Sequence, residues 1–439
     1  MTTLPRFVLV TCLAGCECGA PSGGERADDA GPGDAGAALD TILQAPPAVT
    51  GLPTSASFEA TWALASFECR LDDGAFEPCT APTTWTELAL GPHRLDVRAT
   101  ADGQTDETPA SADFTVVQLV DHPNLAIVEA YGFPAGEGGF TIDMGLWPSQ
   151  LLPFYDLYPD DYVSAAMWTD FPVVDSRPIG GPLRIDVAGI GLDGLYRMGD
   201  DRSGDAGSDG RLEGAAFMQS PQWWEAAATE FPKKVWGERQ LDVLLQEFGH
   251  RWLAYFPLPW EADPSILRDW WGGHWDFHVG LDAPSPMKPW YGPVEDLGDG
   301  TFRIEAWDAP SEYSSADLYG LGLLAAEEVP DFFFVRDATP AEPPANFYDT
   351  LSWTFSGERV DVSMTDVVEA LGPRDPPVDE APKSFRQAFV LVVEPGAAPR
   401  PETLDWLDEQ RRGFEVRFSE ATRGLGTVDT ALWGTTRGL

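Results

Sequence analysis

The chain has 439 residues, of which 71 are acidic and 28 basic, and its formal net charge at neutral pH is -43. A surface of that charge repels phosphate backbones, which excludes nucleic acid as the expected partner. Hydrophobic residues make up 43% of the chain, enough for sizeable cores in two or three domains.

The first fifteen residues have the pattern of a secretory signal peptide. Arg6 precedes an apolar run at 7–12, and Leu13-Ala-Gly-Cys16 places small residues before Cys16. These four residues resemble the bacterial lipobox, which implies that Cys16 is acylated and becomes the first residue of the mature protein. The alternative is a plain signal peptide with incidental cysteines. No other stretch approaches the ~20 continuous apolar residues of a membrane span, so we expect a protein exported to the bacterial cell envelope and held there, on the outer membrane or cell surface, by lipid alone.

Residues 16–44 are rich in Gly, Ala, Asp and Pro and contain too few apolar residues to form a core. This composition predicts a disordered tether between the lipid and the first folded domain. Cys18 lies in this segment and has no role that the sequence assigns.

Residues 45–118 alternate between short strand-like runs and turns. Asp72-Asp73-Gly74 supplies a hairpin turn between two such runs, and the spacing indicates a small β-sandwich. Cys69 and Cys79 lie ten residues apart in a chain expected to be exported, which favours a disulfide between them. The run from Phe67 to Cys79 also resembles bacterial immunoglobulin-like repeats, with their F-x-C-x-L-D-G-x-x-F-x-x-C signature. That resemblance implies a spacer or adhesion module.

From residue 120 to residue 439 strand and helix patterns alternate, and we expect a single α+β domain. Residues 162–168 and 183–190 have the character of buried strands, and helical patterns cover 239–255 and 401–414. A helical wheel of the first helix puts one apolar stripe, including Leu244 and Phe248, toward the core. Gln246 and His250 fall together on the opposite side, between further apolar residues. Such a doubly covered helix is typical of one that presents ligands to a cleft.

Gln246-Glu-Phe-Gly-His250 differs by one residue from H-E-x-x-H, in which two histidines bind zinc and the glutamate acts on zinc-bound water. About two dozen residues downstream, Gly272–His278 offers His274 and His278 as nitrogen ligands. Segments with Ser-Pro-Met at 285–287 and Tyr-Ser-Ser-Ala-Asp-Leu-Tyr at 313–319 follow. In this order the segments resemble a family of secreted bacterial zincin-type metallopeptidase-like proteins, which contain H-E-x-G-H-R-W, G-x-H-W, S-P-M and Y-S-x-x-D-L-Y-L-M-G-L. The resemblance extends over most of residues 120–439.

The resemblance implies an α+β zincin-like domain with an active-site helix, preceded by a small all-β immunoglobulin-like sandwich. The implied activity is zinc-dependent hydrolysis of peptide bonds, with an extracellular protein or peptide as the partner. His250 matches the second zinc ligand, Glu247 the general base and His274 the third ligand, with His278 in reserve.

The last of these segments adds three further candidates. Tyr313, Asp317 and Tyr319 match the family's tyrosine-rich motif. A tyrosine there could hydrogen-bond an oxyanion, and Asp317 could orient a ligand histidine. The alternative is that these side chains pack or cap the structure.

Two residues depart from the family's pattern: Gln246 stands at the first zinc histidine, and Leu321 stands at a methionine. An amide oxygen binds zinc far more weakly than imidazole does, and even changes outside the ligands lower metal affinity ~10–100-fold. We therefore expect zinc occupancy to be weak or lost, and the domain to be a degenerate peptidase, a pseudoenzyme. Two alternatives stay open: an active metallohydrolase with an altered ligand set, and a non-catalytic surface protein that binds protein or glycan. The peptidase ancestry requires Glu247, His250 and His274 to converge on one point.

Overall fold

The computed structural model describes most of the chain from residue 38 to residue 432. The described residues are 38–46, 49–50, 52, 54–89, 91–116, 122–130, 135–136, 139–140, 147–174, 178–190, 201–230, 240–252, 255–269, 273–288, 291–306, 310–344 and 352–432. The proposed signal peptide and lipidated Cys16 lie outside them, as does most of the tether. Among the described residues, no helix combines the length and apolar character needed to cross a membrane.

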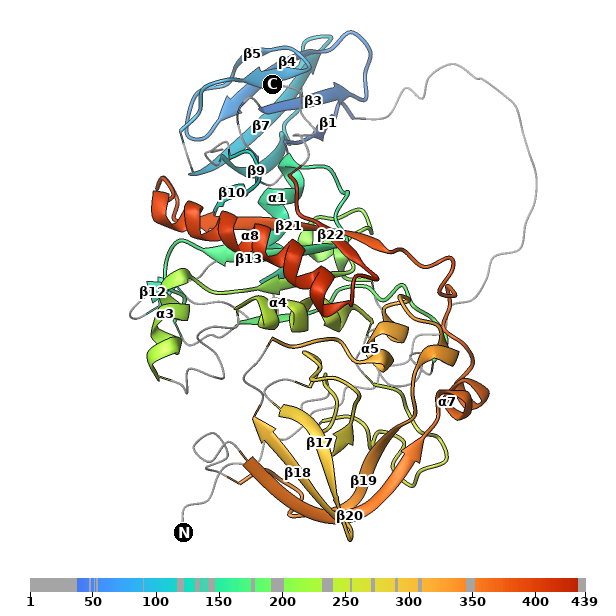
Figure 1. Ribbon diagram of the computed structural model, residues 1–439. Helices are drawn as coiled ribbons and strands as arrows, with labels where there is room; N and C mark the ends of the chain where they lie inside the picture. The colour runs from blue at the N-terminus through green and yellow to red at the C-terminus, as the bar shows by residue number, and fades with distance from the viewer. Residues whose placement is uncertain are drawn as a thin grey trace, which may run out of the picture.

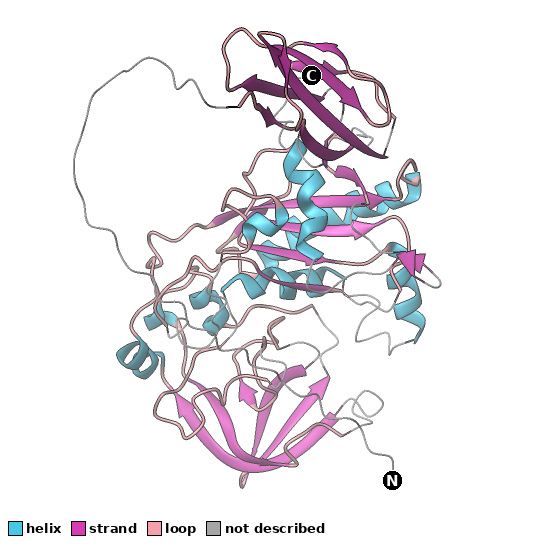
Figure 2. Ribbon diagram, turned by 180° about the vertical axis from the view of Figure 1, so that it is seen from behind, coloured by secondary structure: helices cyan, strands magenta, loops and turns pink. Residues whose placement is uncertain are grey.

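Figure 1 shows three stacked parts: an N-terminal pair of sheets, a central sheet covered by helices, and a separate antiparallel sheet at the far end. Figure 2, from behind, shows the helices concentrated in the central part. Strands outnumber helices in the described chain, and the fold is mixed α and β with several sheets.

Two sheets pack face to face in the N-terminal part. The first has the order β1(Thr41–Gln44), β3(Thr54–Ala60), β6(Thr83–Trp85). The second has the order β2(Val49–Thr50), β9(Ala110–Val116), β7(Gly91–Ala101), β4(Ser66–Leu71), β5(Glu77–Cys79), with β8(Gln104–Thr105) beside β7. Phe58 from one sheet and Leu95, Val97 and Phe114 from the other form a shared core. Alternation of apolar and polar residues along each strand therefore produces a two-layer sandwich.

The sandwich begins earlier than the sequence predicts. Residues 41–44 belong to the expected tether, yet they form strand β1, which pairs antiparallel with β3. The hydroxyl of Thr41 donates to Asp106 at 2.6 Å and accepts from the backbone N–H of Ala99 at 2.9 Å. These contacts tie the segment Thr-Ile-Leu-Gln, which follows a Gly- and Ala-rich stretch, to a domain whose other strands come later in the chain.

Cys69 and Cys79 form the expected disulfide, which joins neighbouring strands β4 and β5 with their Cα atoms 5.7 Å apart. Replacing both cysteines with serine should lower the free energy of unfolding of the sandwich by about 2–3 kcal/mol. The reason is that the cross-link closes a loop in the unfolded chain and so lowers its conformational entropy. Calorimetry of the oxidised protein and the double-serine variant would measure this loss as a downward shift of one transition. Equal transitions in both would contradict it.

The central sheet has the order β10(Ala126–Glu129), β21(Ser384–Val393), β13(Ser164–Thr169), β15(Gly214–Phe217), β14(Ile179–Pro182), and β22(Thr427–Asp429) pairs with β21. All its pairs are parallel except β14, which runs antiparallel to β15 at the edge. The predicted strand at 162–168 corresponds to β13. The predicted strand at 183–190 is wrong: the edge strand lies just before it, and only Ala188 makes an isolated bridge there.

Helices cover both faces of this sheet. On one face, α4(Gln240–Gly249) and α8(Pro401–Ala421) pack against Trp168 and Phe389. On the other face, α1(Leu152–Leu157) packs against Met167 and Val390. Shorter elements of this part are β11(Ala135–Gly136), β12(Gly139–Phe140), η1(Trp147–Leu151), η2(Ser203–Ala206), α3(Pro221–Glu230), η3(His250–Trp252), α5(Ser315–Gly320), η4(Ala326–Glu328) and α7(Met364–Leu371).

The third part is a five-stranded antiparallel sheet, within the residues for which the sequence predicts a single α+β domain. Its order is β16(Val279–Gly280), β19(Phe332–Thr339), β20(Ser352–Val362), β18(Thr301–Ala306), β17(Tyr291–Gly298). Its own aromatic core includes Phe302, Trp353 and Phe355. The loop from α4 to β16, which contains His274 and His278, lies between this sheet and the central part.

Candidate functional site

Helix α4 packs against the central sheet and against helix α8. The ring of Phe248 lies 5.1 Å from that of Phe418 and 5.8 Å from that of Phe385, and its burial contributes about 1.5–3 kcal/mol. After Gly249 the helix tightens into the 3₁₀ turn η3, which begins at His250. A Cβ at Gly249 would lie 2.2 Å from the sulfur of Met287. Glycine at this position therefore lets the Ser-Pro-Met segment pack directly against the end of the helix.

The structure brings Gln246, His250 and His274 together. The imidazole centroids of His250 and His274 are 5.0 Å apart, and Nε2 of Gln246 lies 2.9 Å from Nε2 of His274. All three side chains are buried. The two imidazoles are therefore as close as the expected convergence of Glu247, His250 and His274 requires.

Asp269 fixes His274 from the other side. One oxygen of Asp269 accepts a hydrogen bond from Nδ1 of His274 at 2.9 Å, and the other accepts from the backbone N–H groups of Gly273 and His274. In the neutral imidazole this contact puts the proton on Nδ1 and the lone pair on Nε2. The role of Asp269 could not be predicted from the sequence: in a chain with 71 acidic residues, one carboxylate five residues before a histidine is a weak signal.

Glu247 lies between α4 and the edge strand β14. Its Oε2 is 3.8 Å from Nε2 of His250. A Cβ at Gly180 of β14 would lie 2.7 Å from the same oxygen, so only glycine leaves room for this carboxylate against the strand. The predicted base is thus beside His250, which follows it by three residues in the motif, and against β14, the last strand in the order of the central sheet.

His250 is a neutral base in this setting. Burial, and to a smaller extent the neighbouring His274, lowers the pKa of His250 to about 3. Its imidazole therefore stays uncharged at neutral pH and keeps a lone pair.

The four accessory candidates lie apart from this group. Nδ1 of His278 is 2.6 Å from Asp276, and its ring packs against Trp353 and Phe355 of the third sheet. The hydroxyl of Tyr319 accepts from the backbone N–H of Arg374 at 2.9 Å. In these positions His278 and Tyr319 contact neighbouring segments and not the imidazole pair.

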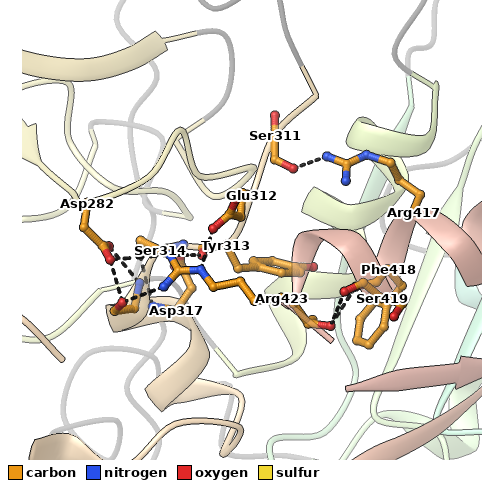
Figure 3. A network of polar contacts seen from close by, with 12 residues as sticks. Asp282, Ser311, Glu312, Tyr313, Ser314, Asp317, Arg417, Phe418, Ser419 and Arg423 are labelled. Atoms are coloured by element: carbon orange, nitrogen blue, oxygen red, sulfur yellow. Dashed lines mark hydrogen bonds and ion pairs between the residues drawn. The ribbon is translucent and has the colours of Figure 1, made fainter. Parts of the chain in front are cut away.

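Tyr313 and Asp317 contact the segments that carry the two imidazoles. The hydroxyl of Tyr313 donates to the carbonyl of Leu245 in α4 at 2.6 Å. Asp317 accepts from the indole of Trp275 at 2.8 Å and from the hydroxyl of Ser285 at 2.6 Å, and it completes the capping box of α5 with Ser314. Figure 3 shows Asp317 in this polar network, which Arg423 extends to Asp282 and Glu312. Leu321, the second departure from the family's pattern, is buried as the C-cap of α5.

The comparisons with known proteins add no relative: no protein-family model matches the chain, and no curated protein matches its sequence. What the site can do therefore depends on its own geometry.

The side chains around the two imidazoles do not form a group of metal ligands in the described residues. Within the described parts of the chain, no three His, Cys, Asp or Glu side chains are grouped so that they could hold a metal ion. Of the two imidazoles, His274 already directs its Nε2 lone pair at the amide of Gln246.

Proposed function

We propose that this chain is a metallopeptidase-like surface protein that binds extended peptide segments without hydrolysing them. The observation that supports it most is the contact between Gln246 and Nε2 of His274, at the position where the family's motif has its first zinc histidine. Surface attachment rests on the N-terminal lipobox resemblance.

Zinc does not fit the residues present. A catalytic zinc needs three protein ligands and an open position for water. Here the first ligand position holds Gln246, a poor ligand whose amide nitrogen faces Nε2 of His274, and His250 beside them is a neutral imidazole. We derive no hydrolytic step at this site.

An open sheet edge next to the imidazole pair supports peptide binding. Strand β14 ends the order of the central sheet and pairs with β15 alone among the described strands. An edge strand presents backbone N–H and C=O groups to which an extended peptide can add as a further strand. A chain with a net charge of -43 attracts neutral or basic peptides more strongly than acidic ones.

Hydrolysis can be tested with casein. We expect the wild-type chain, supplied with zinc chloride, to leave casein intact, and Gln246→His to restore slow cleavage because it supplies the missing imidazole. Gln246→His/Glu247→Ala is the matched control and should be inactive. Cleavage by the wild type that is lost in Glu247→Ala would contradict the proposal and favour the active metallohydrolase with an altered ligand set.

Binding can be tested separately by fluorescence anisotropy with labelled, reduced and alkylated lysozyme, an unfolded basic chain. We expect saturable binding by the wild type and at least tenfold weaker binding by Gly181→Pro. The N–H of Leu183 donates to Glu213 on the β15 side, so by strand alternation the N–H of Gly181 also faces β15. Proline there breaks the pairing that holds the edge strand in place, while the position of its Cβ has no neighbour within 4 Å. Absence of binding, or equal binding by a variant that melts at the wild-type temperature, would count against an edge-strand site.

A further inference from the structure

We infer that Gln246 takes the structural place of the metal: its amide donates to Nε2 of His274 and ties helix α4 to the loop that contains Asp269 and His274. This inference rests on the proposed loss of zinc hydrolysis but adds a role for the residue that replaced the ligand. It concerns how this domain keeps its site assembled.

The proton positions follow from the contacts. Asp269 accepts from Nδ1 of His274, so the neutral imidazole has its lone pair on Nε2, and the atom facing it is the amide nitrogen of Gln246, a donor. A continuous chain of hydrogen bonds thus runs from the backbone N–H of Gly273 through Asp269 and His274 to α4. In a zinc site the metal would take the lone pair that Gln246 satisfies here.

Burial makes this lone pair important. Gln246 is 7% exposed, His274 9% and Asp269 4%. A buried acceptor without a donor destabilises the folded state, more than the net gain from an ordinary hydrogen bond. Without a metal, Nε2 of His274 needs another partner for its lone pair. A side chain with an N–H at position 246 supplies that partner.

Glutamine meets the requirements of the position. Position 246 is four residues before His250, and its side chain reaches Nε2 of His274, whose ring centroid lies 5.0 Å from that of His250. Glutamate would offer only acceptors when ionised, and leucine would offer no polar group. Glutamine is similar in volume to glutamate and leucine, and its amide N–H supplies the donor.

The first test is zinc titration with two readouts, calorimetric binding and thermal unfolding. The wild type should bind no zinc that depends on His274, and zinc chloride or EDTA should leave its melting temperature unchanged. Gln246→His should bind one zinc per chain through His274, at least about 100-fold more tightly than any zinc that the wild type binds. Its melting temperature should rise by about 5 °C when zinc is in large excess over its dissociation constant. Gln240→His, at the start of the same helix, controls for an added surface histidine.

The second test addresses the hydrogen bond itself. Gln246→Leu should melt several degrees below the wild type with no response to zinc. The chain has five histidines, so ¹⁵N-histidine labelling gives a simple spectrum. In the wild type the Nε2 resonance of His274 should be that of an unprotonated acceptor. In Gln246→Leu that resonance should shift. Should Gln246→Leu fail to fold, Gln246→Asn, with a shorter donor, provides the comparison.

Each outcome bears on the inference separately from the proposed function. Stoichiometric, His274-dependent zinc in the wild type without casein cleavage would overturn the inference and leave the proposed function standing. An unchanged melting temperature and unchanged His274 resonances in Gln246→Leu would also overturn it. Casein cleavage by the wild type would instead overturn the proposed function.

Discussion

Replacing Asp317 with alanine should lower the free energy of unfolding of the central domain by about 3–5 kcal/mol. The carboxylate is buried and accepts from Trp275, Ser285 and both the backbone and the hydroxyl of Ser314. Alanine would leave these donors buried without an acceptor. Because Trp275 follows His274 directly, the same change should loosen the imidazole pair. Urea unfolding and the ¹⁵N-histidine spectrum would measure both effects.

Asp282 provides the matched control for this prediction. It lies in the same network (Figure 3) and accepts from Ser315, but its side chain is 31% exposed. Water can replace it there, so Asp282→Ala should lower stability by about 1 kcal/mol. If Asp317→Ala lost no more stability than Asp282→Ala, the central position assigned to Asp317 would be wrong.

The core of the candidate site could be predicted from the sequence because helical spacing is fixed. Residues 246 and 250 share a helix face whatever surrounds them. The downstream position of His274 came from the order of segments in the resembling family, and the structure brings its ring to 5.0 Å from His250. The helix itself is shorter than the predicted 239–255, since Gly249 ends it against Met287.

The parts that were missed depend on contacts between distant segments. Asp269 can contact the ring of His274 because the loop folds back. The backbone N–H of Asp269 donates to the carbonyl of His274 in that turn. Strand β14 lies against α4, and its Gly180 leaves room for Glu247, a relation that no local pattern near residue 180 indicates. The alternating apolar residues at 183–190 suggested the strand a few positions too late. Tyr313 and Asp317 are buried supports because their partners come from α4 and the 275–285 loop.

The third sheet was missed for a different reason. Its strands β18 and β20 bury Phe302, Trp353 and Phe355 on one side and expose charged residues on the other. That pattern is clear strand by strand, but it does not say which sheet a strand joins. His278 illustrates the consequence: by sequence it is near His274, yet its ring packs against the aromatic residues of this sheet.

The free energy of unfolding should depend on pH through Lys288, which directly follows Met287 in the chain. Its ammonium group is buried and donates to the carbonyls of Val279 and Gly292. Burial lowers its pKa to about 7, against a smaller opposing effect of Asp276. In the unfolded chain the pKa is about 10.4. Above pH 7 the unfolded chain therefore binds a proton that the folded chain has released, and the stability contributed by this group increases with pH.

The expected result is a difference in slope between the wild type and Lys288→Met. From pH 7 to pH 9 the wild type should gain about 2–3 kcal/mol of unfolding free energy relative to the variant, since each pH unit contributes up to about 1.4 kcal/mol. Urea unfolding at pH 7, 8 and 9 measures it, below the range in which unfolded tyrosines ionise. Loss of the two hydrogen bonds to carbonyls changes stability equally at every pH, so only the slope reports the titration. Parallel curves would show that Lys288 keeps its proton in the folded chain throughout this range.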